Sequence, residues 1–296
     1  MKYPNTYSLP DLDKYLGIQF PEFELIGRSI AGVETVFAIP QFNLALDIGR
    51  APSFSFNQDV LALTHWHLDH AGGVAFYLGL RCLNSLKPAK IIVPAQTLEQ
   101  AREYLESLKK VSDSQIKYEL VSAQEPLELK KNLVIKSIAN SHCTPSTGYG
   151  VYSKKHRLKK EYHNLSKKQL VELKSQGNEI DEHYEELVLA FSGDTRGEFL
   201  STEANQAKVL IMECSFFGDD GDYDNRREYG HTHIKDWVKH ADQIQSETVI
   251  MSHTSQRYSM KELEAHCVKS LPKELLDKLI LFRNCLLYTS DAADES

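Results

Sequence analysis

The segment THWHLDH is the feature that most restricts how this chain can fold. It places His65, His67, Asp69 and His70 in a His-x-His-x-Asp-His pattern directly after the apolar run DVLAL. Imidazole and carboxylate are the ligands that zinc prefers when its site must keep an open position for water. Two metals about 3.5 to 4 Å apart can stabilise both the attacking and the leaving oxygen of a displacement at phosphorus. The pattern therefore predicts a two-metal hydrolytic centre at the end of a strand.

Such a centre needs more ligands than one loop supplies, and three other apolar runs end in a suitable residue. His142 ends LVIKSIANSH, Asp194 follows LVLAFSG, and His253 ends TVIMSH. Taken singly, a histidine at a strand end is more often a hydrogen-bonded structural residue, and aspartate in SGDT is a common turn former. Because all three follow strands and THWHLDH is also present, we expect them to complete the metal site.

Short β-type runs alternate with helical patterns along most of the chain. The first part of the chain contains consecutive strands, and later strands alternate with helices. This order predicts an α/β fold with helices outside two facing sheets. No repeat or Gly/Ser linker divides the chain, so we expect one domain over residues 1–284. The helical patterns cover residues 72–86, 98–110 and 234–244, and the β-type runs are FELIG, ETVFAIP, NLALDIG, DVLALTH, KIIVPA, LVIKSIANSH, YGVYS, LVLAFSGD, KVLIMEC and TVIMSH.

One charged segment, at about residues 153–186, interrupts this pattern between two strands. From Ser153 to Ser175 it carries eight Lys or Arg against two Glu, and it continues into the acidic stretch EIDEHYEE. A segment with a basic and an acidic half is often only a solvated surface excursion. Nucleic-acid binding depends on local Lys and Arg clusters, so the formal net charge of −7 does not exclude an RNA-binding arm here.

Cysteine content and hydropathy exclude several classes of protein. The five cysteines form no C-x-x-C pair, which argues against a disulfide framework or a thiolate zinc site. No apolar run approaches the roughly 20 residues of a membrane span, and the N-terminal segment lacks the pattern of a secretory signal. We therefore expect an unexported, cytoplasmic protein. The segment CLLYTSDAADES, residues 285–296, resembles translated sequencing-adaptor sequence and is expected to be a non-native tail.

Six short segments occur in the same order as in ribonuclease Z, the tRNA 3′-endonuclease family. They are THWHLDH, SHCTPSTGY, FSGDT, MECSFF, YGHTH and SHTSQRY. The charged segment also resembles the shortened arm of the short, plant-type members. This resemblance runs from about Ile30 to Phe282. It implies the four-layer αβ/βα sandwich of the metallo-β-lactamase fold with a short projecting arm.

The resemblance further implies a ligand set and a reaction. A hydroxide oriented by Asp69 would attack the phosphodiester just after the discriminator nucleotide and release the 3′ trailer of precursor tRNA. The implied ligands of two zinc ions per chain are His65, His67 and His142 on one ion, Asp69, His70 and His253 on the other, and Asp194 as the bridge.

Protonation of the leaving group requires an acid separate from the metals. The resemblance points to His231 and Glu213 for this role. Glu213 follows the apolar run KVLIM, where an unpaired buried carboxylate would be costly, and a histidine held by that carboxylate retains its proton more readily. This chain has His231-Thr232-His233 where many members have His-Ser-Thr, so either imidazole is a candidate. The structural alternative is that both are helix N-terminal residues facing water.

Substrate contacts are expected from two regions. Arg257 in SHTSQRY can hold a phosphate with its planar donor fork, or it can form a surface salt bridge. The resemblance implies a homodimer in which the arm of one subunit clamps the tRNA that the other cleaves. The candidate arm contacts are Lys154, Lys155, Lys159 and Lys160. The segment IPQFNLALDIGR lacks the Pro-x-Lys-x-Arg-Asn loop of bacterial members, which leaves open how a mature CCA end is rejected.

Fold and metal centre alone do not determine a substrate, so other functions remain open. One alternative is another hydrolase of the same fold, such as a lactonase, a thioesterase or a general phosphodiesterase. The YGHTH segment, Glu213 and the basic arm distinguish the RNA enzyme, because a small ester substrate requires none of them. The other alternative is a non-catalytic binding scaffold, which would be expected to have lost one or more ligands.

Overall fold

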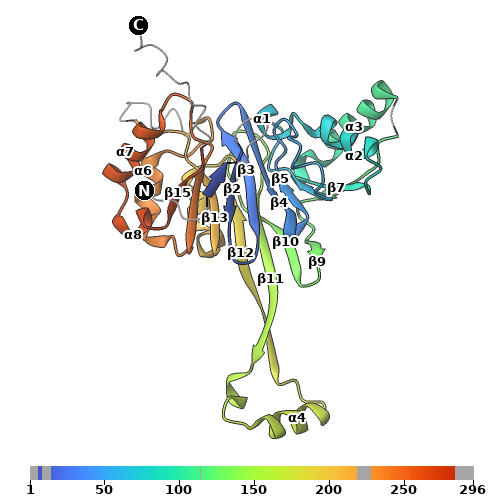
Figure 1. Cartoon of the computed structure of the whole chain (residues 1–296), viewed down its shortest axis with the longest axis vertical. Helices are drawn as coiled ribbons and strands as arrows, with labels where there is room; N and C mark the ends of the chain where they lie inside the picture. The colour runs from blue at the N-terminus through green and yellow to red at the C-terminus, as the bar shows by residue number, and fades with distance from the viewer. Residues whose placement is uncertain (1–5, 9–14, 114, 219–227, 284–296) are drawn as a thin grey trace.

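The chain folds into two β-sheets that face each other, with helices on the outer face of each sheet (Figure 1). The computed structural model describes residues 6–8, 15–113, 115–218 and 228–283. These four layers confirm the predicted αβ/βα sandwich. The tail predicted at residues 285–296 lies outside the described residues.

The first sheet contains eight strands in sequence order. Neighbours from β1 to β5 pair antiparallel, whereas β5 to β8 pair parallel. Its parallel central strands are nearly continuous in apolar residues, as expected for strands that are covered on both faces. The strands are β1 Thr6–Ser8, β2 Leu16–Gln19, β3 Glu24–Ile30, β4 Glu34–Ile39, β5 Leu44–Leu46, β6 Val60–Ala62, β7 Ala89–Val93 and β8 Tyr118–Ser122.

The second sheet contains seven strands in the order β15-β14-β13-β12-β11-β10-β9. Pairing is antiparallel from β9 to β12 and parallel from β12 to β15. Strands β10, β12, β13 and β14 therefore run in the same direction, and their carboxyl ends meet at one edge. The strands are β9 Leu127–Lys130, β10 Leu133–Ile138, β11 Gly148–Leu158, β12 Asp181–Phe191, β13 Val209–Glu213, β14 Thr248–Ser252 and β15 Leu279–Leu281.

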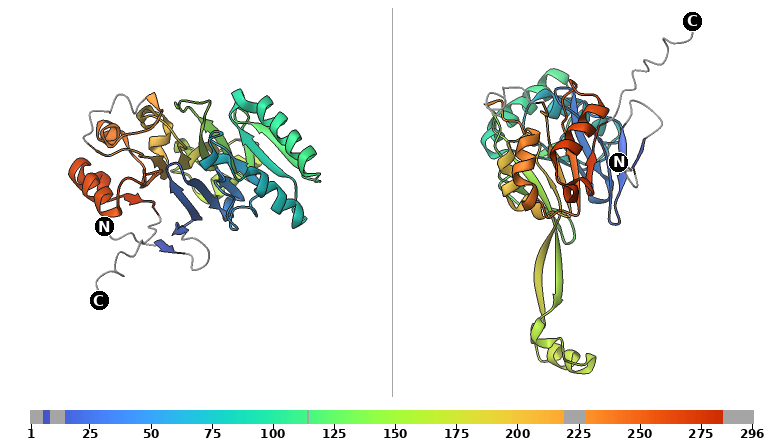
Figure 2. Two further views of the ribbon diagram at one scale, coloured as in Figure 1. Left: turned by 90° about the horizontal axis from the view of Figure 1, so that it is seen from above. Right: turned by 90° about the vertical axis from the view of Figure 1, so that its left-hand side faces the viewer.

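Helices cover the two outer faces in separate groups (Figures 1 and 2). α2 and α3 pack on the first sheet through Tyr77 and Leu105, and α6 to α8 pack on the second through Trp237, Leu263 and Leu275. The three predicted helical patterns are confirmed as α2, α3 and α6. The helices are α1 Leu68–Ala71, α2 Val74–Leu83, α3 Leu98–Ser112, α4 Lys167–Ser175, α6 Ile234–His240, α7 Met260–Ser270 and α8 Lys273–Leu276, with short 3-10 turns at Pro40–Phe42, Ala95–Thr97, Lys160–Tyr162, Gly197–Ser201, Glu203–Gln206 and Ala241–Gln243.

The main core lies between the two sheets. Phe37 of the first sheet contacts Phe191 of the second with ring centroids 5.5 Å apart, and it contacts Phe282 at 5.0 Å. All three side chains are fully buried. Burial of large aromatic side chains is a major source of stability, so these contacts fix the two sheets and the strand ends that they carry.

The charged segment forms an arm that projects from the sandwich (Figures 1 and 2). Strands β11 and β12 continue into it as an antiparallel ladder that ends at Leu158 opposite Asp181. The tip contains α4, whose first residues are held by a capping box between Ser166 and Gln169. The arm at 153–186 was predicted as an interruption between two strands, and the structure shows that the strands themselves form its stem.

Candidate metal centre

Seven side chains meet at the edge of the sandwich where the parallel strands end. His65 and His67 follow β6, and α1 begins one residue later and carries Asp69 and His70. The second sheet supplies the other three, because β10, β12 and β14 end at the same edge. These are His142, Asp194 and His253, so every side chain predicted as a metal ligand is brought to one place.

The first group of candidate ligand atoms comes from His65, His67, His142 and Asp194, and all of these atoms lie within 4.8 Å of one another. His142 Nε2 lies 3.4 Å from His67 Nδ1, and His65 Nε2 lies 3.7 Å from Asp194 Oδ2. Burial lowers the pKa of His65, His67 and His142, which favours the neutral imidazole that binds metal ions.

The second group comes from Asp69, His70 and His253. His253 Nε2 lies 3.3 Å from His70 Nε2 and 3.4 Å from Asp69 Oδ2. Asp194 also faces this group, because its Oδ1 lies 3.2 Å from His70 Nε2 and 3.3 Å from His253 Nε2. The two oxygens of Asp194 therefore face different groups of imidazoles, which is the arrangement a bridging carboxylate requires.

Hydrogen bonds behind three of these imidazoles set their tautomers. Nδ1 of His70 lies 2.7 Å from an Asp47 carboxylate oxygen, and Nδ1 of His142 lies 2.8 Å from the Gly230 carbonyl oxygen. Ser215 donates its proton to Glu213, so its oxygen accepts from Nδ1 of His253 at 3.0 Å. Each Nδ1 therefore carries a proton, and Nε2 is the ring nitrogen left to bind a metal ion.

The arrangement fits divalent cations. His65 Nε2 and Asp194 Oδ1 are buried yet make no hydrogen bond within the described residues. Asp194 is only 2% exposed, and a buried carboxylate is costly without a counter-charge. Ligand atoms about 2.0 to 2.1 Å from a tetrahedral zinc ion lie about 3.3 to 3.4 Å apart, close to the spacings found here.

His253 of the cluster and Asp47 behind His70 both adopt left-handed backbone conformations. Asp47 has a φ of 51° and His253 has a φ of 53°. Such conformations are uncommon for residues other than glycine and persist where the surrounding structure holds them. The His253 amide donates to Ser29 Oγ at 2.9 Å, while Asp47 accepts from the amide of Thr64 at 2.7 Å. The backbone is thus held in the conformation that directs both side chains toward His70.

Next to the cluster, His231 and Glu213 form the pair that the sequence predicted. His231 Nδ1 lies 3.0 Å from Glu213 Oε1, and Glu213 also accepts from the Thr195 amide at 2.7 Å and from Ser215. Burial alone would lower the pKa of His231, but the Glu213 carboxylate outweighs it and raises that pKa to about 9. His231 therefore carries a proton at neutral pH.

His233 has a structural position instead. Its Nδ1 accepts from the amide of Lys235 at 3.0 Å and caps α6, while its Nε2 lies 2.9 Å from the carbonyl oxygen of Gly218. Both ring nitrogens of His233 are occupied within its own loop. Of the two imidazoles that the sequence left as candidates for the acid, the geometry favours His231.

Comparison with known proteins identifies the family. The tRNase Z TRZ1 of Arabidopsis thaliana is 37% identical over 270 residues, which cover 89% of this chain and 96% of that protein. The chain belongs to the tRNase Z family. A second relative, tRNase Z TRZ2, chloroplastic, of the same plant, is 34% identical and covers 86% of this chain and 73% of its own length. No family model matches the chain.

Solved structures support the fold. The metallo-β-lactamase fold protein YhfI from Bacillus subtilis matches 82% of this chain and 91% of its own with a TM-score of 0.57 at 12% identity. The short form of human tRNase Z matches 82% of this chain and 86% of its own with a TM-score of 0.50 at 17% identity. The metallo-β-lactamase fold is thereby confirmed. Family membership also confirms that the chain is a hydrolase, an endoribonuclease acting on phosphodiester bonds.

In this tRNase Z family member a cavity of about 270 Å³ opens beside the cluster. Asp69, His231 and Arg257 line it together, so the predicted phosphate-binding arginine faces the same space as the candidate acid. Phe216 also lines the cavity, and its ring centroid lies 6.0 Å from that of His231. The cavity has room for a substrate phosphate between these side chains.

The four predicted arm lysines lie away from this cavity. α1, which carries Asp69 and His70, and α4 lie at opposite ends of the molecule (Figure 1). Lys155 forms an ion pair with Glu186, so part of the positive charge of the stem is neutralised within the fold. No ion pair is formed by Lys154, Lys159 or Lys160 within the part of the chain that the structure describes.

Sequence reasoning missed the residues that hold the candidate ligands in place. Asp47 follows the apolar run NLAL, and Ser215 follows Glu213 by two residues. An aspartate directly after a buried strand was a usable signal for Asp47. The role of Ser215 depends on its contact with His253, which is distant in the sequence, and no local pattern marks it.

Proposed function

We propose that this protein is a zinc-dependent endoribonuclease that removes the 3′ trailer of precursor tRNA by cleaving after the discriminator nucleotide. The observation that carries the proposal is the two groups of ligand atoms joined by Asp194, next to the His231–Glu213 pair. Membership of the tRNase Z family supports RNA as the substrate. No helix among the described residues combines the length and apolar content of a membrane span.

We assign seven residues to two zinc ions per chain. When bound, the ions would lower the pKa of a water molecule and neutralise negative charge on the scissile phosphate. The ligands would be His65, His67 and His142 on one ion, Asp69, His70 and His253 on the other, and Asp194 between them.

The protein side chains would supply the remaining steps. Asp69 accepts from the Gly32 amide at 2.9 Å, which holds its carboxylate at the wall of the cavity, where it can orient an attacking water. Nδ1 of His231 donates a hydrogen bond to Glu213, so Nε2 can deliver a proton to the departing oxygen. Arg257 can hold a phosphate oxygen through its donor fork.

The arm would bind the body of the tRNA. Because α1 and α4 lie at opposite ends of the molecule, the arm tip of one chain does not approach its own cluster (Figure 1). This separation supports a homodimer in which the arm of one subunit holds the tRNA cleaved at the other. The protein would act in the cytoplasm.

Another hydrolase of the same fold, such as a lactonase, a thioesterase or a general phosphodiesterase, is the alternative. A small ester would need neither a proton donor backed by a buried carboxylate nor a projecting arm. Incubation of the zinc-loaded protein with a 3′-extended tRNA precursor, followed by sizing of the fragments, tests the proposal. We expect cleavage at one position, directly after the discriminator. An intact precursor together with rapid turnover of a lactone or thioester would establish the alternative.

A further inference from the structure

The stem of the arm presents two chemically different faces. In the ladder of β11 and β12, Lys154 lies opposite Glu185, and His156 lies opposite His183. Because alternate residues of a strand point to opposite faces, these two cross-strand pairs share one face, and the residues between them occupy the other.

On the second face the positive charges are neutralised. Arg157 forms an ion pair with Glu182, which lies directly opposite, and its guanidinium lies 5.1 Å from the ring centroid of Tyr184. Lys155 forms an ion pair with Glu186. This face therefore has little net charge to offer a ligand.

The first face keeps its cationic and donor groups available. Its two carboxylates are both paired: Glu185 forms an ion pair with Lys136 from the neighbouring strand β10, and Asp181, opposite Leu158, forms one with Lys174. No ion pair to Lys154, and no hydrogen bond to the side chain of His156 or His183, is formed within the described residues. The two imidazole centroids are 6.2 Å apart. This face thus has an excess of donors over acceptors.

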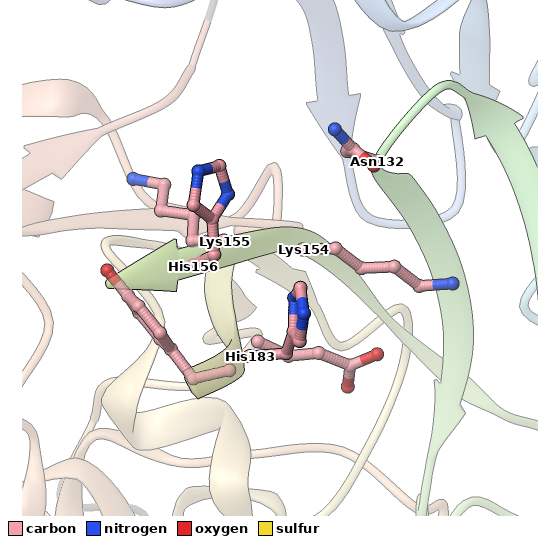
Figure 3. A pocket seen from close by; sticks show the side chains of 7 residues that line it. Asn132, Lys154, Lys155, His156 and His183 are labelled. Atoms are coloured by element: carbon pink, nitrogen blue, oxygen red, sulfur yellow. The ribbon is translucent and has the colours of Figure 1, made fainter. Parts of the chain in front are cut away.

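These groups border a hollow of about 350 Å³ at the root of the arm, shown in Figure 3. The side chain of Asn132, from the turn between β9 and β10, stands beside Lys154, and the His156 and His183 side chains come from the two strands of the stem (Figure 3). The backbone fixes this arrangement, because the Lys154 amide donates to the Asn132 carbonyl oxygen at 2.8 Å.

We infer that this hollow is a binding site for a phosphate group of the RNA backbone, held by Lys154, His156 and His183. Two opposed imidazoles can also hold a transition metal, but the ammonium group of Lys154 on the same face disfavours a cation, and Glu185 is already paired with Lys136. An ammonium group with imidazole and amide donors suits a phosphate oxygen. The inference rests on the proposed function, since RNA is the expected source of the phosphate.

The hollow is separate from the metal centre. β11 begins at Gly148, beside the cluster, because the Thr147 amide donates to the Thr64 carbonyl oxygen. Eight residues of extended strand separate Gly148 from His156, a distance of about 27 Å. A phosphate bound here therefore does not lie at the metal centre of the same chain.

The test compares the two faces of the stem. A variant with Lys154→Gln, His156→Gln and His183→Gln should bind a fluorescently labelled, mature-length tRNA about tenfold more weakly than the unchanged zinc-loaded protein. The slope of log affinity against log salt should fall by about 0.9, because one bound phosphate is no longer neutralised by the protein. Arg157→Gln is the matched control, because it removes one positive charge from the opposite face. It should change affinity less than twofold.

Three further comparisons make the result decisive. Lys154→Arg should restore most of the affinity that Lys154→Gln alone removes, which a change in folding would not explain. Equal weakening by Arg157→Gln would overturn the inference in favour of general electrostatics. A further outcome is that the triple variant binds tRNA with the affinity of the unchanged protein while the unchanged protein cleaves a tRNA precursor. That outcome would refute this phosphate site and leave the proposed function intact. A protein that cleaves no precursor tRNA would refute the function itself.

The source of the phosphate is tested by nuclear magnetic resonance on protein labelled with ¹⁵N at histidine. We expect the His156 and His183 signals to move when tRNA is added and to remain in place with millimolar inorganic phosphate. Movement with inorganic phosphate but not with tRNA would identify a small-anion site and overturn the inference. Movement with added zinc, beyond the amount that loads the cluster, would identify a metal site and overturn it as well.

Discussion

The metal centre and the arm carry charged groups in opposite physical settings. At the centre, His65, His70 and Asp194 are at most 2% exposed. Hydrogen bonds to Nδ1 of His65 and of His70 set the orientation of these imidazoles. On the arm, α4 has no buried residue and the stem is held by cross-strand ion pairs at the surface. Buried groups can be positioned for chemistry, whereas exposed charges act through long-range attraction that salt weakens. The difference suggests that the centre carries out cleavage and the arm provides binding.

The most severe test of this division is the substitution Asp69→Ala. We expect RNA cleavage to be abolished while the thermal midpoint changes little, because Asp69 faces the cavity and is not in the core. Cleavage assays and thermal denaturation on protein with measured zinc content check this. Retention of even a tenth of the original activity would remove Asp69 from its proposed role.

Substitution of the two neighbouring histidines separates the acid from the helix cap. His231→Ala should keep both zinc ions but slow cleavage by roughly 10²- to 10⁴-fold, the usual range for removal of a general acid. His233→Ala should mainly lower stability, because it removes the cap of α6. Rate and metal content are measured for both. A slow, stable His233→Ala protein beside an active His231→Ala protein would reverse the assignment.

Removal of the arm tests whether the arm contributes to tRNA binding while leaving the hydrolytic step unchanged. Ser153 and Glu186 lie opposite each other in the ladder, so deletion of 154–185 can be closed with an Asn-Gly turn. Precursor-tRNA cleavage should fall by orders of magnitude, mostly through KM, whereas hydrolysis of a small phosphodiester should persist within a few-fold. If the armless protein cleaves tRNA as well as the intact protein at matched zinc and salt, the arm has no role in substrate binding.

Substitution of a residue that forms a hydrogen bond with a candidate ligand should have an intermediate effect, on zinc affinity. Asp47→Asn keeps the size of the side chain but removes the negative charge that holds Nδ1–H of His70. Loss of such a partner typically costs 10- to 100-fold in metal affinity. Competition with a chelator measures it. Zinc affinity unchanged from that of the unsubstituted protein would show that backbone geometry alone orients His70.

Neutralising Lys154, Lys155, Lys159 and Lys160 together should have the smallest effect. Because Lys155 is already paired with Glu186, we expect this variant to remove fewer than four interactions with phosphate. The slope of log affinity against log salt should flatten by about 0.9 for each of them. Binding titrations at several salt concentrations measure the slope. An unchanged slope would mean that the arm is only a solvated surface.

Much of the site was predictable because it depends on local order in the sequence. Each predicted ligand lies within a few residues of the end of an apolar run, and parallel strands bring such positions to one edge whatever the details of packing. Helix α7 was missed, although Ser259 and Glu262 form a capping box at its start. Its short, mostly polar sequence gave a weak periodic signal, and burial of Leu263 and Cys267 against the second sheet stabilises it.

The sequence by itself determined the types of the candidate ligands, their places near strand ends, and the existence of an arm between two strands. The tertiary structure decided that His231 and not His233 meets Glu213, that Asp47 and Ser215 orient the imidazoles, and that the two faces of the stem differ in charge. The physical reason is the range of the interactions. Strand ends and ligand chemistry follow from neighbouring residues, whereas hydrogen bonds and cross-strand register join residues that only folding brings together.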